Sequence, residues 1–255
     1  MMAEYVLIPG ETRLKREDFL ELLLRRMDHD FDDVFYKVRS SASVLKLLSG
    51  NGQLQEQTLA TINPSVTHAE NITKSIKALG LNPRTTQFDL GELLGKLQLY
   101  TENKWVENVD VGLTCEGDIK VSNLEAPTYA QVWNFITNAY AASALKATKT
   151  IEVSGQVIHL SADELNNLGV NSGLYTTDDE FVRISVRDHG RGIEEGKLER
   201  IFENGYTSKQ GDTSNSGIGL ALTETTARSV HGFVKVESEI GEGSTFSMYM
   251  PRERK

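Results

Sequence analysis

The feature that most constrains the fold is an uninterrupted run, residues 16–49, that contains neither proline nor glycine. Apolar residues follow one another along it at alternating spacings of four and three, from Leu20 to Leu48, with Ser41 at the one position of the series that is not apolar. This pattern predicts a long helix with a single narrow apolar seam. Glycines within 50–52 interrupt the run, and the spacing resumes over 59–79. Because two helices with one seam each cannot bury both edges of their pair, we expect an antiparallel helical hairpin that completes a four-helix bundle as a homodimer.

The polar, turn-like residues 81–86 mark a boundary between two domains, which we place at 1–85 and 86–255. Beyond this boundary, segments with helical spacing alternate with strand-like runs. The helices are expected near 89–102 and 127–147, and the strands near 109–114, 150–159, 181–187, 233–239 and 244–250. The chain is therefore expected to be an α+β protein, in which the helical hairpin precedes a two-layer α/β sandwich. The polar residues 160–180 are expected to form a peripheral connection between two strands.

Composition and charge exclude several classes of protein. The net charge is −9, which opposes binding to the phosphate backbone of nucleic acids. No window approaches the roughly 18 consecutive apolar residues of a membrane-spanning helix, and the first residues lack the order of a signal peptide. We therefore expect a cytoplasmic protein without a membrane segment. The single cysteine, Cys115, rules out an internal disulfide framework and a multi-cysteine zinc site.

Two groups of polar residues in the second half suit ligand binding. Asn134 and Asn138 are four apart in an expected helix and so share a face, where an amide oxygen suits Mg²⁺. Helix-surface asparagines without a ligand are the alternative. Asp188 follows an apolar strand and precedes Gly190 and Gly192. Its carboxylate can accept a hydrogen bond from an exocyclic amine while the glycines let backbone approach a flat ligand, although the same residues also suit a plain turn.

A third group, residues 211–219, is rich in glycine and opens a helix expected over 220–229. Backbone amides at such a loop bind phosphate, although a lone Gly-x-Gly is weak evidence by itself. In their order, the three groups resemble the nucleotide-binding boxes of the histidine-kinase branch of the Bergerat-fold ATPases. The closing run over 231–251 resembles the end of the same domain, so that the resemblance covers about residues 86–251.

The resemblance implies a Bergerat-type ATP-binding domain that uses ATP and Mg²⁺, with Asn138 as the magnesium ligand and Asp188 as the group that binds adenine. It also implies a mobile lid over 203–216, in which Lys209 either reaches a phosphate or is a solvated surface lysine. Asn134 stands where ATP-hydrolysing relatives of other branches carry a water-activating glutamate, which favours transfer to a protein over hydrolysis. The residues expected to bind the nucleotide are Asn134, Asn138, Asp188, Gly190, Gly192, Ile193, Phe202, Lys209, Gly217, Gly219, Leu220 and Thr245.

The predicted hairpin carries a candidate phosphoacceptor. His29 occupies the position farthest from the apolar seam and is expected to project into solvent. Residues 28–31 resemble the phosphoacceptor box of histidine kinases, which implies that His29 is phosphorylated and that Asp30 accepts the imidazole proton. An incidental histidine on a charged helix face is the alternative. Asp33 stands where relatives with phosphatase activity usually have threonine, asparagine or glutamine, which argues against that activity.

The sequence therefore predicts a protein-histidine kinase that phosphorylates His29 and passes the phosphoryl group to an aspartate of a response regulator. No segment of the sequence resembles a sensor module, so we expect the kinase to receive its signal from a sensor module that is separate or missing. Two alternatives stay open. The first is a protein serine kinase or anti-sigma-type regulator with the same ATP pocket, which acid-stable phosphate would reveal. The second is a phosphotransfer protein with a vestigial ATP site, which would not bind nucleotide.

Overall fold

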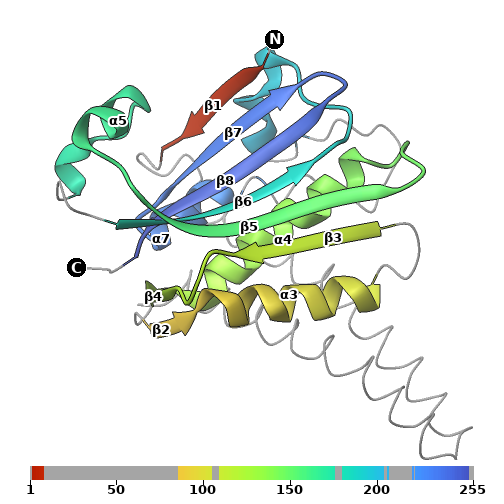
Figure 1. Cartoon of the computed structure of the whole chain (residues 1–255). Coiled ribbons are helices and arrows are strands. Elements are labelled where there is room, and N and C mark those ends of the chain that lie inside the picture. The colour runs from red at the N-terminus through yellow and green to blue at the C-terminus, as the bar shows by residue number, and fades with distance from the viewer. Residues whose placement is uncertain are drawn as a thin grey trace, which may run out of the picture.

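The computed structural model describes residues 2–8, 86–104, 109–175, 180–203, 206, 220 and 222–252 (Figure 1). The run that predicts the helical hairpin, with His29, Asp30 and Asp33, lies outside these residues. So do Lys209 and the second glycine pair, Gly217 and Gly219. The hairpin and its four-helix bundle therefore stay predictions, and the structure bears on the second domain.

The strands are β1 (Ala3–Leu7), β2 (Thr86–Asp89), β3 (Val109–Cys115), β4 (Lys120–Asn123), β5 (Lys149–His159), β6 (Glu180–Asp188), β7 (Phe233–Glu239) and β8 (Gly243–Pro251). The α-helices are α3 (Leu90–Lys104), α4 (Glu125–Ala142), α5 (Ala162–Asn167) and α7 (Thr223–Ser229), and the 3-10 helices are η1 (Ser172–Leu174), η2 (Glu195–Lys197) and η3 (Arg200–Phe202). Every strand predicted beyond residue 108 is confirmed within a residue or so, whereas the helix predicted over 127–147 ends earlier, at Ala142. None of the helices in the described part of the chain is long and apolar enough to cross a membrane.

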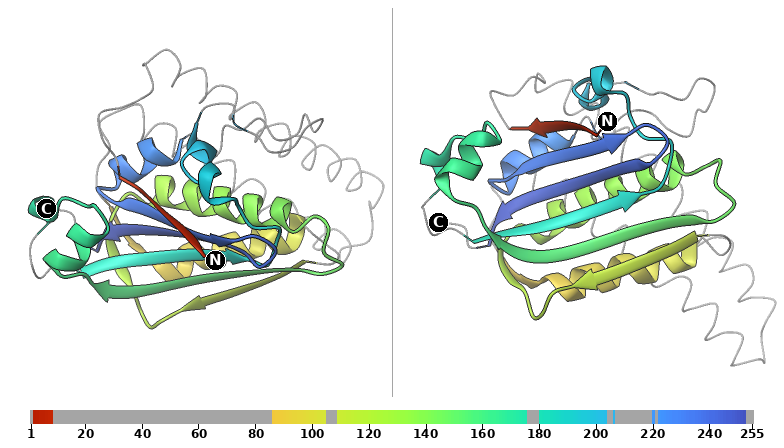
Figure 2. Two further views of the ribbon diagram at one scale, coloured as in Figure 1. Left: turned by 90° about the horizontal axis from the view of Figure 1, so that it is seen from above. Right: turned by 45° about the horizontal axis from the view of Figure 1, so that its top comes forward.

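The large sheet has the order β1-β7-β8-β6-β5-β3. Its neighbouring strands are antiparallel except β3 and β5, which are parallel. Helices α3, α4 and α7 lie along one face of this sheet, and α5 lies apart from them at one end (Figures 1 and 2). The small β2–β4 pair, which was not predicted, lies beside α3. The expected α+β architecture of helices layered on a sheet is thus confirmed for the described residues.

Alternation along the central strands decides which face packs on the helices. In β6, Val182, Ile184 and Val186 are at most 1% exposed and belong to the main core. Phe135 of α4 belongs to the same core and is fully buried. Burying one such side chain contributes about 1.5–3 kcal/mol. This packing holds β6 against α4, and with it Asp188 at the end of the strand.

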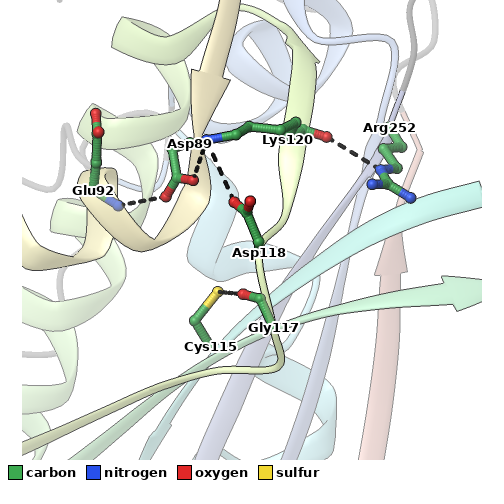
Figure 3. A network of polar contacts seen from close by, with 7 residues as sticks. All are labelled: Asp89, Glu92, Cys115, Gly117, Asp118, Lys120 and Arg252. Carbon is green, nitrogen blue, oxygen red and sulfur yellow. Dashed lines mark hydrogen bonds and ion pairs between the residues drawn. The ribbon is translucent and has the colours of Figure 1, made fainter.

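Polar contacts fix the start of α3 (Figure 3). Asp89 Oδ1 accepts a hydrogen bond from the backbone N–H of Glu92 at 2.8 Å, and Oδ2 lies 2.7 Å from Lys120 Nζ on β4. The hydrogen bonds from Lys120 and then from Glu92 lower the pKa of Asp89 to about 2, so that the carboxylate stays charged. Arg252 Nε donates to the carbonyl oxygen of Lys120 at 3.1 Å. These contacts join α3, β4 and the residue that follows β8.

The polar segment 160–180 forms more than the expected connection. The Ser161 hydroxyl accepts a hydrogen bond from the Glu164 N–H at 3.2 Å, and the Glu164 carboxylate accepts one from the Ser161 N–H at 2.8 Å. This reciprocal capping box starts α5. Leu165 of α5 then packs with Phe181 in a second apolar cluster. Because Phe181 alternates with the main-core residues of β6, this cluster covers the sheet face opposite α4.

The strand β1 joins the sheet of the second domain. The first domain predicted from the sequence, 1–85, includes these residues, but β1 pairs with β7 at the edge of the large sheet. Ala3 and Leu7 are buried, at 8% and 5% exposed. An apolar alternation this short cannot be recognised as a strand by periodicity alone. Only its pairing with β7 places these residues in the sheet.

Candidate nucleotide-binding site

Asp188 is the last residue of β6, and its side chain is only 2% exposed. Its Oδ1 accepts a hydrogen bond from the backbone N–H of Gly190 at 2.8 Å. Burial raises the pKa of this carboxyl from 3.8 to about 6, and the backbone N–H groups of Gly190 and Ser244 offset part of the rise. A carboxylate has about four lone-pair sites, so a buried one favours a ligand that donates an N–H. This environment fits the exocyclic amine of adenine.

The loop after Asp188 is shaped by close backbone approaches. A Cβ atom on Gly190 would lie 2.6 Å from the backbone carbon and oxygen of Ala142, at the end of α4. Gly192 has a φ of +70°, and a Cβ there would run into the carbonyl oxygen of Glu239. The backbone N–H of Arg191 also donates to the carbonyl oxygen of Ala142 at 3.3 Å. The two glycines predicted from the sequence therefore let the loop fit between α4 and the β7–β8 turn.

Two serine hydroxyls beside this loop were not singled out from the sequence. Ser244 is opposite Asp188 in the pairing of β6 with β8 and is 4% exposed. Its hydroxyl lies 3.0 Å from that of Ser238 on β7, which accepts a hydrogen bond from the backbone N–H of Ile193 at 2.8 Å. Residues opposite one another in an antiparallel pair share a face, so Ser244 lies on the face of Asp188. The contacts join the loop to both strands of the closing hairpin.

Thr245, which was expected to bind the nucleotide, is on the other face. It lies opposite Arg187 of β6 and Glu237 of β7. Successive side chains of a strand point to opposite faces, so the sheet separates the Thr245 side chain from that of Asp188. The structure therefore assigns the position facing the site to Ser244 and not to Thr245. The alternation of Phe246, Met248 and Met250, which belong to the main core, puts Ser244 on the core face, so the period along β8 is the signal that distinguishes these neighbours.

The amides of α4 lie as their spacing predicts, one turn apart on one face. Asn134 is 5% exposed and Asn138 is half-buried. On the turn before, Gln131 Nε2 donates to Thr223 Oγ1 at 3.0 Å, which ties α4 to α7. This contact fixes α7, the helix that follows Gly217 and Gly219, to α4, the helix that carries Asn138. An amide oxygen is a hard donor of the kind that Mg²⁺ accepts.

Apolar side chains come after the loop of Gly190 and Gly192 along the chain. Ile193, Phe202, Tyr206 and Leu220 are partly buried against the main core. The rings of Phe202 and Tyr5 are stacked, with centroids 5.8 Å apart and planes at 30°. Three of these four residues were expected to contact the nucleotide, and Tyr206 was not. The backbone N–H of Tyr206 donates to the carbonyl oxygen of Glu203, just after η3, at 3.2 Å.

Comparison with known proteins gives a consistent result. Residues 125–254 match the family described as histidine kinase-, DNA gyrase B- and HSP90-like ATPases. A segment of 77 residues is 43% identical to a probable C4-dicarboxylate sensor kinase of Halalkalibacterium halodurans and covers 30% of this chain and 14% of that protein. A segment of 79 residues is 40% identical to the sensor histidine kinase GraS of Staphylococcus haemolyticus and covers 30% of this chain and 23% of GraS.

Among solved structures, the catalytic domain of the histidine kinase ThkA is similar to this chain. The TM-score is 0.52 at 22% identity, over 67% of this chain and 97% of that domain. At this identity the similarity establishes the fold. The chain matches less than a quarter of the length of either sensor kinase.

Proposed function

Because the chain belongs to the family of histidine kinase-, DNA gyrase B- and HSP90-like ATPases, we propose that it is an ATP-dependent protein-histidine kinase of a two-component system. One observation carries the proposal: the buried Asp188 carboxyl at the end of β6, beside a loop whose glycines leave no room for side chains. The sensor kinases among the relatives support the kinase class over the two alternatives.

Each described residue of the site has a separate role in this proposal. Asp188 accepts a hydrogen bond from the adenine amine, and the loop of Gly190 and Gly192 lets backbone approach the flat base. Asn138 holds Mg²⁺, which offsets the charge of the phosphates when it is bound. Asn134 contributes no carboxylate that would activate water. The residues thus favour transfer of the phosphoryl group to a protein over hydrolysis.

The phosphoacceptor in this proposal is His29. Its imidazole nitrogen forms a bond to the γ-phosphorus of ATP as the bond to the β-phosphate oxygen breaks and ADP leaves, and Asp30 takes the imidazole proton. The phosphoryl group then passes to an aspartate carboxylate on the receiver domain of a response regulator. A homodimer through the predicted hairpin, in the cytoplasm, completes the proposal.

Incubation with γ-labelled ATP and Mg²⁺ tests this function. His29→Ala is compared with the wild type and with His68→Ala, which removes the other histidine of the predicted hairpin. We expect acid-labile label on the wild type and on His68→Ala, no label on His29→Ala, and equal nucleotide binding by all three. Label on His68 would refute the choice of phosphoacceptor. Acid-stable label would instead favour the serine kinase.

A further inference from the structure

We propose that Tyr5 is a positioning residue for the nucleotide site, acting through the ring of Phe202. The inference rests on the proposed ATP-binding function and adds a residue from the opposite end of the chain. It is carried by the pairing of β1 with β7 and by the stacking of the two rings.

The strand β1 places Tyr5 on the face of the sheet that carries the site. Tyr5 is opposite Val236, which belongs to the main core, and Ala3 is opposite Ser238. Ser238 is the residue whose hydroxyl binds the backbone N–H of Ile193, in the loop after Asp188. Because paired residues of antiparallel strands share a face, Tyr5 and Ala3 lie on the face of that serine.

Charged side chains on the opposite face favour this register of β1. Glu4 is opposite Glu237, and Lys235 Nζ lies 3.0 Å from Glu4 Oε2 and 3.1 Å from Glu237 Oε1. The Lys235 side chain is 17% exposed, so salt screens these contacts less than it screens a fully exposed pair. A slip by one residue would move Glu4 to the other face and turn Tyr5 away from the site. The contacts of Lys235 therefore favour the register in which Tyr5 meets Phe202.

The contact with Phe202 links β1 to the proposed nucleotide pocket. Phe202 is the last residue of η3, and its side chain is only partly buried against the main core. The Tyr5 ring supplies a further surface, stacked on it at a centroid distance of 5.8 Å. A stacked aromatic pair contributes free energy beyond that of the apolar area it buries, and so it favours one position of the ring. Without the Tyr5 ring, we expect Phe202 to be less well ordered for contact with the nucleotide.

The test is calorimetric binding of a non-hydrolysable ATP analogue with Mg²⁺ to the full chain. Tyr5→Phe keeps the ring and Tyr5→Leu does not, and both lose the hydroxyl, so their difference reports the ring alone. We expect Tyr5→Phe to bind as the wild type does and Tyr5→Leu to bind about 2- to 10-fold more weakly, the range that aromatic pairs give. Val6→Ala is the matched control, because Val6 is in the same strand but packs on the second apolar cluster. It should lower the thermal stability and leave Kd unchanged.

A double-mutant cycle with Phe202→Leu tests the route of the effect. Phe202→Leu should weaken binding by itself, and Tyr5→Leu should add less than about 2-fold once Phe202→Leu is present, because the ring through which Tyr5 acts is then gone. Tyr5→Thr, a good strand former, replaces Tyr5→Leu if that variant does not fold. Equal Kd values for the Phe and Leu variants, or an equal loss in Val6→Ala, would overturn the role of the ring. A wild type that does not bind the analogue would refute the proposed ATP site itself.

Discussion

Replacing Asp188 with asparagine should stabilise the nucleotide-free protein near neutral pH and weaken nucleotide binding. The side chain is 2% exposed, and burial raises the pKa of its carboxyl from 3.8 to about 6. Above this pH the folded protein holds a buried charge that water would solvate in the unfolded chain. Asparagine has nearly the same shape and keeps an acceptor for the Gly190 N–H, but it carries no charge.

The size of the effect follows from the difference in pKa. A rise of about 2 units corresponds to about 3 kcal/mol, at about 1.4 kcal/mol per unit. Because the folded state binds the proton more tightly, Asp188 contributes stability that is fully present below about pH 4 and is lost as the pH rises through about 6. The asparagine amide would meet the Ser244 N–H donor, which costs about 1 kcal/mol. We therefore expect a net gain of roughly 1–2 kcal/mol at pH 7.5.

Urea unfolding of the wild type and Asp188→Asn between pH 4 and pH 8, without nucleotide, measures this difference. The two proteins share every other titratable group, so the difference in their free energies of unfolding isolates Asp188. The advantage of the variant should grow from pH 4 to pH 7 and then stay constant. A difference that is independent of pH would refute the reasoning. With nucleotide present, the variant should bind roughly 5- to 150-fold more weakly because it leaves the adenine amine unsatisfied.

Three further substitutions test other parts of the proposal. Asn138→Ala should remove the Mg²⁺-dependent part of the nucleotide affinity and leave the protein folded, since Asn138 is only half-buried; calorimetry with and without Mg²⁺ checks this. Gly190→Ala should lower the free energy of unfolding by roughly 2–4 kcal/mol, and Gly196→Ala, where a Cβ meets nothing within 4 Å, should change it by less than about 1 kcal/mol. Asp30→Asn should slow autophosphorylation by roughly 10²–10⁴-fold at unchanged nucleotide affinity, and a wild-type rate of labelling would contradict its role as the base.

Much of the second domain could be predicted from the sequence because its buried residues recur at the regular spacing of a strand or a helix. The alternation over 181–187 predicts a strand directly before Asp188, and the observed strand β6, Glu180–Asp188, confirms it to within a residue. The spacing of Asn134 and Asn138 places both on one face of α4 without reference to any other element. These features depend only on neighbours within one helix or one strand.

The features that were missed depend on pairing between distant segments. Ser244 is an exception, because the alternation of main-core residues along β8 already puts Ser244, and not Thr245, on the core face. The strand β1 is recognisable only beside β7, far along the chain. Likewise, the cluster that Leu165 forms with Phe181 requires α5 to fold back onto the sheet. Contacts between distant segments are properties of the folded chain, and a periodic pattern does not say which distant segments meet.

The raised pKa of Asp188 also links nucleotide binding to proton release. The loop beside it is held by Ala142 and Glu239, so the acceptor is in place before a ligand arrives. A donor N–H stabilises the charged carboxylate and so lowers its pKa below about 6. Near pH 5.5, below the raised pKa of Asp188, the free carboxyl binds a proton, and binding should release more protons from the wild type than from Asp188→Asn. At pH 7.5 the two proteins should release the same number, because the carboxylate is already charged. Calorimetry in buffers of different ionisation enthalpy counts these protons, and equal release at pH 5.5 would mean that no ligand donor meets Asp188.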